Sequence, residues 1–366
     1  MMENYAEAKA KRDVGLLVVV LQSLGPIWII LKAQPNLLAG IGGLPSSWLT
    51  VLSADMDMNG LLSRGQFFTI FFTLLAFVRP TIPTAAPKFL RHWFPLVAWW
   101  LFSDDSTTEL VRDARDDPET SPEAWIYVNG ICTTRKMAVD TGRRLAQMFH
   151  RNVQVVHNPT DSVVVDILEC VFGKMFVAES WSISEPAAHL RAALKAALES
   201  ESKTKVVLVA HSQGTIIAAH VLYLLWEDVD NQREKLTEEH MAKLEIYQFA
   251  NAGQVMKTRA KTDAAGHPVT FPYIESICNQ QDNVGMLGAN APELAKKEWG
   301  ISIAGKVIHP STVLWGHMIN AHYLKPFSDG DYGASHLHGY MGGGGWAPRP
   351  QAKPAPMATI PLDRQD

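Results

Sequence analysis

Short apolar runs alternate with amphipathic stretches along the chain between residues 124 and 308. An apolar run bounded by turn residues predicts a buried strand, and apolar residues spaced three and four positions apart predict a helix. The predicted strands are 124–128, 153–156, a run that begins at 206, 244–249, 272–278 and 306–308, and the predicted helices are 136–150, 161–178 and 185–200. This alternation predicts an α/β fold, with a mostly parallel sheet and helices on both of its faces.

The first 103 residues are more hydrophobic than the rest and form a separate N-terminal segment in this interpretation. The stretch from Val14 to Leu31 is uncharged over 18 residues, which is the minimum length for a helix that spans a bilayer. Pro26 lies inside this stretch, and a proline kinks a helix. Two interpretations stay open: membrane association through residues 14–31, or buried helices that cap the following domain.

Two shifts in composition set the remaining domain limits. Residues 104–123 are charged and contain two prolines, so we expect a solvated linker there. Residues 330–366 contain a run of four glycines followed by a proline-rich stretch, so we expect a disordered tail. Between the linker and the tail, residues 124–329 form the predicted α/β domain.

Composition narrows the classes of partner. The net charge of −4 and the isoelectric point near 6.4 give no reason to expect nucleic acid as a partner. Cys132, Cys170 and Cys278 are too far apart for a disulfide framework or a zinc site, and they favour buried thiols in a reducing, intracellular compartment. The sequence contains no phosphate loop, dinucleotide fingerprint or metal-ligand cluster, so we expect neither a cofactor nor a metal.

The run that begins at Val206 continues into the most informative chemical pattern of the chain, VVLVAHSQGTIIAA. The pattern predicts a buried strand, a sharp turn at Ser212 and a helix, which is the context of a nucleophile elbow. Such a turn packs the strand so closely against the helix that small residues are needed on both sides of the serine, and Ala210 and Gly214 supply them. We expect His211 to order this turn rather than to take part in the chemistry.

Polar residues follow the predicted strands where each strand ends. Asn129 follows the strand 124–128, Ser212 follows the strand from 206, Asp282 lies four residues past the strand that ends at 278, and His317 lies in the loop after 306–308. Because ligands bind beyond the carboxyl ends of parallel strands, we expect these side chains at one edge of the sheet. The chain order of serine, aspartate and histidine is the order that a triad on such a sheet requires.

Acyl transfer explains what each member of this triad would do. A serine hydroxyl is a poor nucleophile until a base takes its proton, so His317 is the predicted base and Asp282 the residue that holds its imidazole. Glu275 and Asp263 are the alternatives for the acid, but neither lies just past the end of a strand. His322 is the alternative for the base and stays open, although His317 is favoured because it precedes a predicted helix.

These pieces together resemble the α/β-hydrolase superfamily, in particular a lipase- and esterase-like branch with an asparagine–glycine loop after the first core strand. The matching pieces are WIYVNGICTT at 125–134, HNPTD at 157–161, VAHSQG at 209–214, CNQQDNVGMLG at 278–288 and WGHMINAHYL at 315–324. Two positions depart from the pattern, because Asn129 stands where many relatives carry histidine and Ala210 stands where they carry glycine.

The resemblance implies an oxyanion hole made by the backbone N–H of Gln213, with the N–H of Ile131 or Gly130 as the second donor. It also implies a serine hydrolase that cleaves a carboxylic ester through an acyl-enzyme. The aromatic-rich N-terminal segment favours a hydrophobic or lipid ester as the substrate. Two alternatives stay open: a hydrolase-fold enzyme of small-molecule biosynthesis that transfers an acyl group, releases a product or opens or closes a ring, and a catalytically inactive membrane-bound scaffold.

Overall fold

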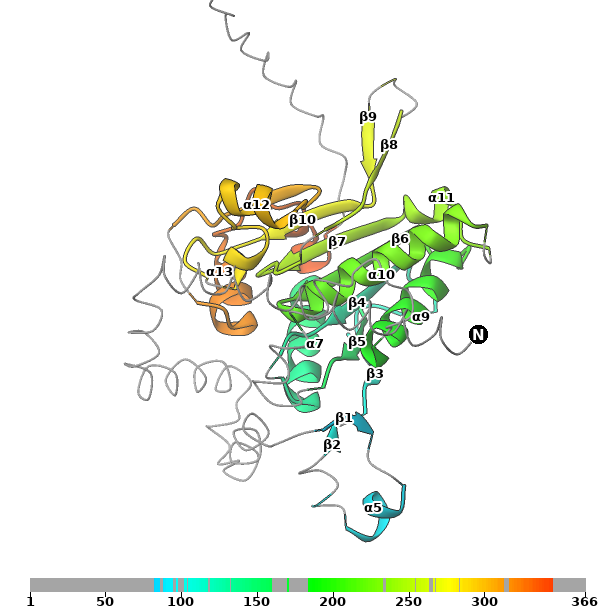
Figure 1. Cartoon of the computed structure of the whole chain (residues 1–366). Helices are drawn as coiled ribbons and strands as arrows, with labels where there is room; N and C mark the ends of the chain where they lie inside the picture. The colour runs from blue at the N-terminus through cyan, green and yellow to red at the C-terminus, as the bar shows by residue number, and fades with distance from the viewer. Residues whose placement is uncertain are drawn as a thin grey trace, which may run out of the picture.

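The centre of the molecule is a seven-stranded sheet with the strand order β11-β10-β7-β6-β4-β5-β3 (Figure 1). Neighbouring strands are parallel except β3 and β5, which run antiparallel. The strands are β3 (Thr107–Val111), β4 (Glu123–Val128), β5 (Val153–His157), β6 (Lys205–His211), β7 (Leu244–Phe249), β10 (Tyr273–Ile277) and β11 (Lys306–Ile308). The computed structural model describes residues 82–85, 88–94, 97, 102–103, 105–117, 119–131, 133–159, 170, 184–232, 235–253, 255–262, 266, 268–282, 284–312 and 316–344.

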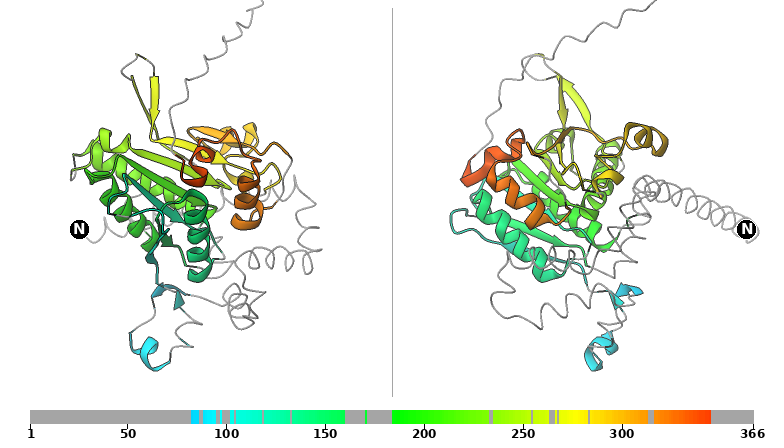
Figure 2. Two further views of the ribbon diagram at one scale, coloured as in Figure 1. Left: turned by 180° about the vertical axis from the view of Figure 1, so that it is seen from behind. Right: turned by 90° about the vertical axis from the view of Figure 1, so that its left-hand side faces the viewer.

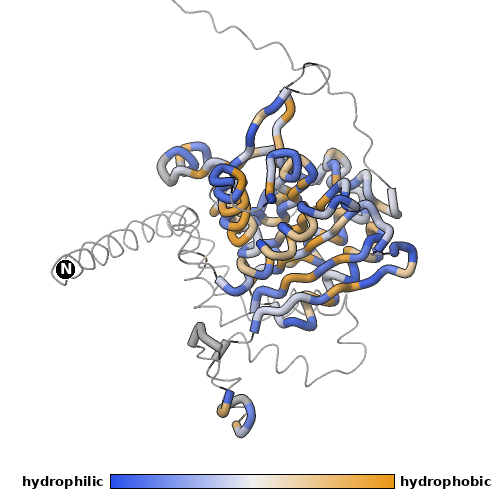
Figure 3. Tube along the Cα trace, turned by 90° about the vertical axis from the view of Figure 1, so that its right-hand side faces the viewer, coloured by the Kyte–Doolittle hydropathy of each residue, from blue (hydrophilic) through white to orange (hydrophobic). Residues whose placement is uncertain are grey.

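Helices cover both faces of this sheet (Figure 2). Helix α7 (Arg135–Phe149) packs on one face, and α9 (Glu185–Glu199) and α10 (Gln213–Asp230) pack on the other. Successive residues of β6 alternate between the two cores, so that Val207 belongs to the α7 core and Leu208 to the α9 and α10 core. A central parallel strand is buried on both faces, which explains the continuous apolar sequence of β6 from Val206 to Ala210. Figure 3 shows hydrophobic residues, in orange, concentrated in the middle of the molecule.

The structure confirms the α/β class and the mostly parallel sheet. Each strand and helix predicted between 124 and 308 and lying in the described residues starts and ends within one residue of its expected bounds. The predicted helix 161–178 lies outside the described residues except for Cys170.

The region predicted as a linker, 104–123, differs from this expectation over residues 107–111, which form β3 at one edge of the sheet. Val111 is buried against α7, whereas the neighbouring Leu110 is 45% exposed. An edge strand pairs on one side only and tolerates a charged side chain such as Glu109, which is half-buried and forms an ion pair with Arg135 of α7 at 3.0 Å. A charged composition therefore did not prevent this segment from joining the sheet.

The region predicted as a disordered tail differs in the same way over residues 330–344. Tyr332, Leu337 and Tyr340 are completely buried in the α7 core, and the last two belong to the short helix η3 (His336–Gly343). Fully burying a large apolar side chain contributes about 1.5–3 kcal/mol, so three such anchors offset the flexibility of the surrounding glycines. Residues 345–366 lie outside the described residues.

The N-terminal segment is described only from residue 82. Strands β1 (Ile82–Ala85) and β2 (Phe102–Ser103) pair in parallel, and the short helix α5 (Lys88–Trp93) lies between them in the chain. Residues 14–31, on which the prediction of a membrane helix rests, lie outside the described residues. Among the residues that the structure does describe, no helix combines the length and hydrophobicity needed to cross a bilayer.

Four short elements complete the region around the carboxyl ends of β6, β7 and β10. These elements are η1 (Gly285–Leu287), α12 (Glu293–Trp299), the π-helix η2 (Ile319–Leu324) and α13 (Lys325–Asp329). A hairpin of β8 (Arg259–Thr262) and β9 (Pro268–Phe271) projects from the sheet, and α11 (Glu238–Met241) precedes β7 (Figure 1). The loop after β10 and the loop after β11 meet beside the end of β6.

Candidate active site

The turn between β6 and α10 has the sharp geometry that the sequence predicts. Ser212 has a φ of 56° and a ψ of −123°, in the region that favours glycine. A β-carbon on Gly130 would lie 2.5 Å from the Ser212 β-carbon, and one on Gly214 would lie 2.6 Å from the carbonyl oxygen of Val128. Glycine is therefore required at both positions. Holding a non-glycine residue in such a conformation costs about 1–3 kcal/mol, which the surrounding packing offsets.

The departure at Ala210 is accommodated by the packing around the turn. Ala210 is completely buried, and its methyl group belongs to the α9 and α10 core rather than to the turn itself. Its backbone pairs with Val128 of β4 on one side and with Gln248 of β7 on the other. An alanine at this position therefore leaves the geometry of Ser212 intact.

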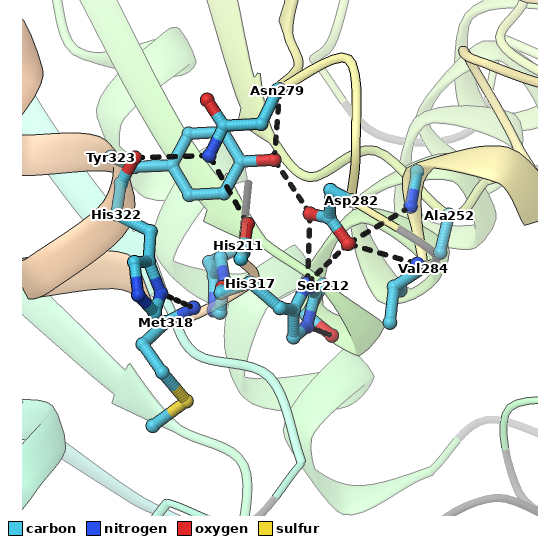
Figure 4. A network of polar contacts seen from close by, with 12 residues as sticks. His211, Ser212, Ala252, Asn279, Asp282, Val284, His317, Met318, His322 and Tyr323 are labelled. Carbon is cyan, nitrogen blue, oxygen red and sulfur yellow. Dashed lines mark hydrogen bonds and ion pairs between the residues drawn. The ribbon is translucent and has the colours of Figure 1, made fainter. Parts of the chain in front are cut away.

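The structure brings Ser212, His317 and Asp282 together (Figure 4). The Nε2 atom of His317 lies 2.8 Å from the Ser212 Oγ, and its Nδ1 atom lies 2.9 Å and 3.1 Å from the two carboxylate oxygens of Asp282. Because a carboxylate only accepts, Nδ1 carries the proton and Nε2 is left to accept the hydroxyl proton of Ser212. The Asp282 side chain is fully buried, whereas that of His317 is 26% exposed.

The Asp282 carboxylate accepts hydrogen bonds from side-chain and backbone donors. Besides His317, the Tyr323 hydroxyl donates to Oδ2 at 2.6 Å and the Val284 N–H donates to Oδ1 at 2.8 Å. Burial alone raises the pKa of Asp282, but the charge and hydrogen bond of His317, with the bonds from Tyr323 and Val284, outweigh burial and lower the pKa below its ordinary value. Asp282 is therefore an anion at neutral pH and is suited to stabilise an imidazolium.

His211 supports this arrangement without access to the serine proton. Its Nε2 atom lies 2.9 Å from the carbonyl oxygen of His317, which can only accept, so Nε2 carries the ring proton. Burial, reinforced by the nearby charge of His317, lowers the pKa of His211 to about 3. The neutral His211 ring lies beside the His317 ring, with 4.9 Å between centroids, and fixes its backbone.

His322, the alternative base, lies one helical turn beyond His317. Its Nδ1 atom accepts the backbone N–H of Met318 at 3.0 Å. A β-carbon on Gly316, which has a φ of 95°, would lie 2.6 Å from the His322 ring, so the ring packs directly on the loop that carries His317. The hydrogen bond to Ser212 is made by His317, and His322 holds the start of η2.

The predicted oxyanion residues lie beside the serine. Gly130 packs against Ser212, Ile131 follows it, and Gln213 is the first residue of α10, where helical N–H groups lack intrahelical acceptors. The side-chain amide of Asn129 donates to the carbonyl oxygen of Asn158 at 2.7 Å, and its Oδ1 atom accepts the Asn158 N–H at 2.9 Å, so this side chain links the loops after β4 and β5. Asn129 thereby shapes the loop that carries Gly130.

Besides Asp282, the sequence offers other acidic residues and cysteines near the site. Glu275 is completely buried in a separate cluster, where its carboxylate accepts the hydroxyls of Tyr273 and Ser335. Asp263 and Cys132 lie outside the described residues. Cys278 is fully buried, and burial raises the pKa of its thiol to about 12, so it is protonated and unreactive at neutral pH.

Sequence reasoning missed two residues of the site, Tyr323 and Asn279. Tyr323 contacts Asp282 across 41 positions of the chain. The side chain of Asn279 donates to the carbonyl oxygens of Gly316 at 3.1 Å and of His322 at 3.0 Å. Asn279 follows a predicted strand, which could have marked it, but a tyrosine inside an apolar helix carries no such signal.

Comparison of the chain with protein-family models and with curated proteins finds no match. Among the residues that the structure describes, no cluster of histidine, cysteine, aspartate or glutamate has a geometry that could hold a metal ion. The chemistry of the site therefore has to be inferred from its own geometry.

Proposed function

We propose that the protein is a serine hydrolase of the α/β-hydrolase superfamily that cleaves a carboxylic ester through an acyl-enzyme. The observation that carries this proposal is the position of His317, which bridges the Ser212 hydroxyl and the buried Asp282 carboxylate within hydrogen-bonding distance of both. A serine in a strained turn, next to a base that is itself oriented by an acid, is the arrangement that nucleophilic catalysis needs.

The first half of the reaction follows from this geometry. His317 takes the hydroxyl proton of Ser212 on Nε2 while the Oγ atom attacks the ester carbonyl, and the tetrahedral intermediate forms. The backbone N–H of Gln213, with that of Gly130 or Ile131, stabilises the oxyanion. His317 then gives its proton to the leaving alcohol as the carbon–oxygen bond breaks, which leaves the acyl group on Ser212.

The second half repeats these steps with water. His317 takes a proton from water, whose oxygen attacks the acyl carbonyl, and it then returns that proton to the Ser212 Oγ as the acid is released. Asp282 stays ionised throughout and stabilises each imidazolium. Loss of a single oxyanion donor would slow such a reaction roughly 100- to 1,000-fold.

The fold supports the assignment to this superfamily. The nucleophile follows the central strand β6 of the mostly parallel sheet, and the acid and the base follow β10 and β11 at the same edge. This is the edge at which open α/β sheets bind their ligands. The chain order of Ser212, Asp282 and His317 is that of α/β-hydrolases.

A hydrophobic or lipid ester is the proposed substrate class, and the protein is proposed to act inside the cell at a membrane surface. Phe89, Trp93 and Phe94 are 61%, 71% and 57% exposed, and residues 58–103 contain no aspartate or glutamate. Exposed aromatic residues in a stretch without negative charge are suited to an interface with lipid headgroups. Residues 14–31 are the proposed attachment.

Hydrolysis of p-nitrophenyl esters of increasing chain length, added to the full-length protein with lipid vesicles, tests both parts of the proposal. We expect kcat/KM to rise with chain length and to vanish in Ser212→Ala. Equal rates for all chain lengths would contradict the hydrophobic substrate. The absence of turnover with every ester would contradict hydrolysis and leave acyl transfer to another acceptor, or an inactive scaffold, as the explanation.

A further inference from the structure

The Asp282 carboxylate has a second side-chain donor in addition to His317. The Tyr323 hydroxyl donates its proton to Oδ2 at 2.6 Å, and the same hydroxyl oxygen accepts the backbone N–H of Asn279 at 3.2 Å. A phenol has one proton, so with the Asn279 N–H on its oxygen the hydroxyl can direct that proton only to Asp282. Both residues of this pair are buried, the Tyr323 side chain completely.

The position of Tyr323 in the chain connects the acid to the base. Tyr323 belongs to η2, the π-helix that starts two residues after His317, so one short segment carries both the base and a donor to the acid. Asn279 closes the connection from the other side, because its side-chain amide donates to the carbonyl oxygens of Gly316 and His322. The loop that carries Asp282 and the segment that carries His317 are thus joined by the Tyr323–Asp282 bond and by the two bonds from Asn279.

We propose that Tyr323 is a positioning residue, whose hydroxyl holds the Asp282 carboxylate in the orientation that accepts His317. This inference rests on the proposed function of the site. The ring of Tyr323 is fixed by its packing against Phe249 and Tyr332, at centroid distances of 5.8 Å and 6.4 Å. Removing the hydroxyl alone, as in Tyr323→Phe, would keep that packing and delete one hydrogen bond.

The hydrogen bond from Tyr323 also lowers the proton affinity of the Asp282 carboxylate, which faces the His317 imidazole. Burial raises the pKa of Tyr323 well above its ordinary value, so the hydroxyl stays protonated and can donate at any working pH. Its hydrogen bond contributes to the lowered pKa of Asp282. Asp282 and His317 form a coupled pair, and a carboxylate that has lost this donor holds the shared proton more tightly.

Other groups near Asp282 do not change this expectation. The titratable side chains that face it come from η2 and its flanks, from β6 and from the end of β10: His317, His322, Tyr323, Tyr332, His211 and Cys278. Burial is the largest cause of the lowered pKa of His211 and His322 and of the raised pKa of Cys278 and Tyr332. Each of these shifts favours the neutral form of its group.

The test follows proton uptake by the pair directly, in the full-length protein with isotopically labelled histidine, by NMR of the His317 ring across a pH series. The His317 signals are assigned by their loss in His317→Gln. We expect the midpoint of proton uptake to rise by roughly one pH unit in Tyr323→Phe. Where ester hydrolysis is measured, we expect the plateau kcat to fall roughly tenfold, KM to stay unchanged, and the acid limb to move to higher pH.

The matched control is Tyr247→Phe, which also deletes a buried tyrosine hydroxyl that donates to a carboxylate, 2.8 Å from Glu245 Oε2. We expect no shift of the midpoint in this variant. An equal midpoint in wild type and Tyr323→Phe, or an equal shift in both variants, would overturn the positioning role. The NMR titration does not depend on ester hydrolysis. The proposed function fails if wild type turns over no ester, and that outcome is measured separately from the role of Tyr323.

Discussion

Among the described residues, the hydrogen-bond networks around Asp282 and around Glu245 and Glu275 are both buried and lie at different places on the same sheet. They differ in the groups that their donors contact. Asp282, beyond the carboxyl end of β10, accepts from Tyr323 and from His317, whose second nitrogen contacts Ser212. Glu245 and Glu275, inside β7 and β10, accept from tyrosine and serine hydroxyls and from Lys205.

The network of Glu245 and Glu275 connects the C-terminal segment to the sheet. The Tyr340 hydroxyl donates to Glu245 at 2.8 Å, and the Ser335 hydroxyl and the His336 N–H donate to Glu275 at 2.6 Å and about 3.0 Å. These donors come from residues 335–340, so the two glutamates fasten the C-terminal segment to the sheet. Burial and tyrosine donors are therefore common to both networks, and of the two only the Asp282 network includes an imidazole that bridges to a serine hydroxyl.

Removing Ser212 or His317, the two residues whose side chains form the hydrogen bond at the centre of the site, is expected to have the largest effect on kcat. In Ser212→Ala and His317→Ala, kcat for ester hydrolysis should fall by roughly a million-fold, because the nucleophile or its base is lost. Steady-state kinetics with a p-nitrophenyl ester measures this change. Tyr340→Phe, in the other network, serves as the control and should keep kcat near wild type; an equal loss there would mean that the two networks are not separate.

Neutralising one carboxylate in each network should separate activity from stability. We expect Asp282→Asn to lower kcat about 10,000-fold, because the imidazole is then held in the wrong tautomer. Glu275→Gln should leave kcat unchanged but lower the free energy of unfolding by about 1.5–3 kcal/mol, because one of its oxygens becomes a donor that faces other donors. Kinetics and urea denaturation of both variants provide the measurement, and the reverse pattern would refute the division of roles.

A smaller effect is expected for Tyr340→Phe on stability. This hydroxyl donates to Glu245 and accepts from Lys205 at 2.6 Å, and its loss should lower the free energy of unfolding by about 1–2 kcal/mol. Limited proteolysis should then cut more readily between residues 330 and 344, because the C-terminal segment is held less firmly. Unchanged cleavage together with unchanged stability would show that Glu245 does not fasten this segment.

The smallest expected effect is a contribution of Asp282 to stability that depends on pH. Because its pKa is lower in the folded than in the unfolded protein, Asp282 stabilises the fold above its unfolded pKa of about 3.9, and this contribution is lost as pH falls through the folded value. Urea denaturation between about pH 5 and pH 2 should show the stability difference between wild type and Asp282→Asn shrinking as pH falls. A difference that grows toward acid pH would contradict the lowered pKa.

The arrangement of Ser212, Asp282 and His317 could be predicted from the sequence as far as contiguous residue patterns determine it. Ser212 lies in a strand, turn and helix whose residues are contiguous, and Asp282 and His317 follow predicted strands, so the parallel sheet places all three at one edge. Whether His317 or His322 approaches the serine depends on the path of a loop. In the structure His317 contacts both Ser212 and Asp282, whereas the His322 ring packs on Gly316 and accepts the Met318 N–H.

Tertiary contacts explain what the sequence could not predict. Strand β3 lies in a charged stretch, and η3 lies in a glycine-rich one, so composition indicated a linker and a disordered tail. Pairing with β5 orders the first, and the burial of Tyr340 together with its bond to Glu245 orders the second. Such partners lie far away in the chain and leave no local pattern.

The central claim is that His317 activates Ser212 and that the network of Glu245 and Glu275 has no such role. Treatment of the folded full-length protein with a fluorophosphonate, followed by mass spectrometry of its peptides, tests this claim most directly. We predict one adduct, on Ser212, in wild type and in Glu275→Gln, and no adduct in Ser212→Ala or His317→Ala. A folded wild type without an adduct, or an adduct that persists in His317→Ala, would contradict the account.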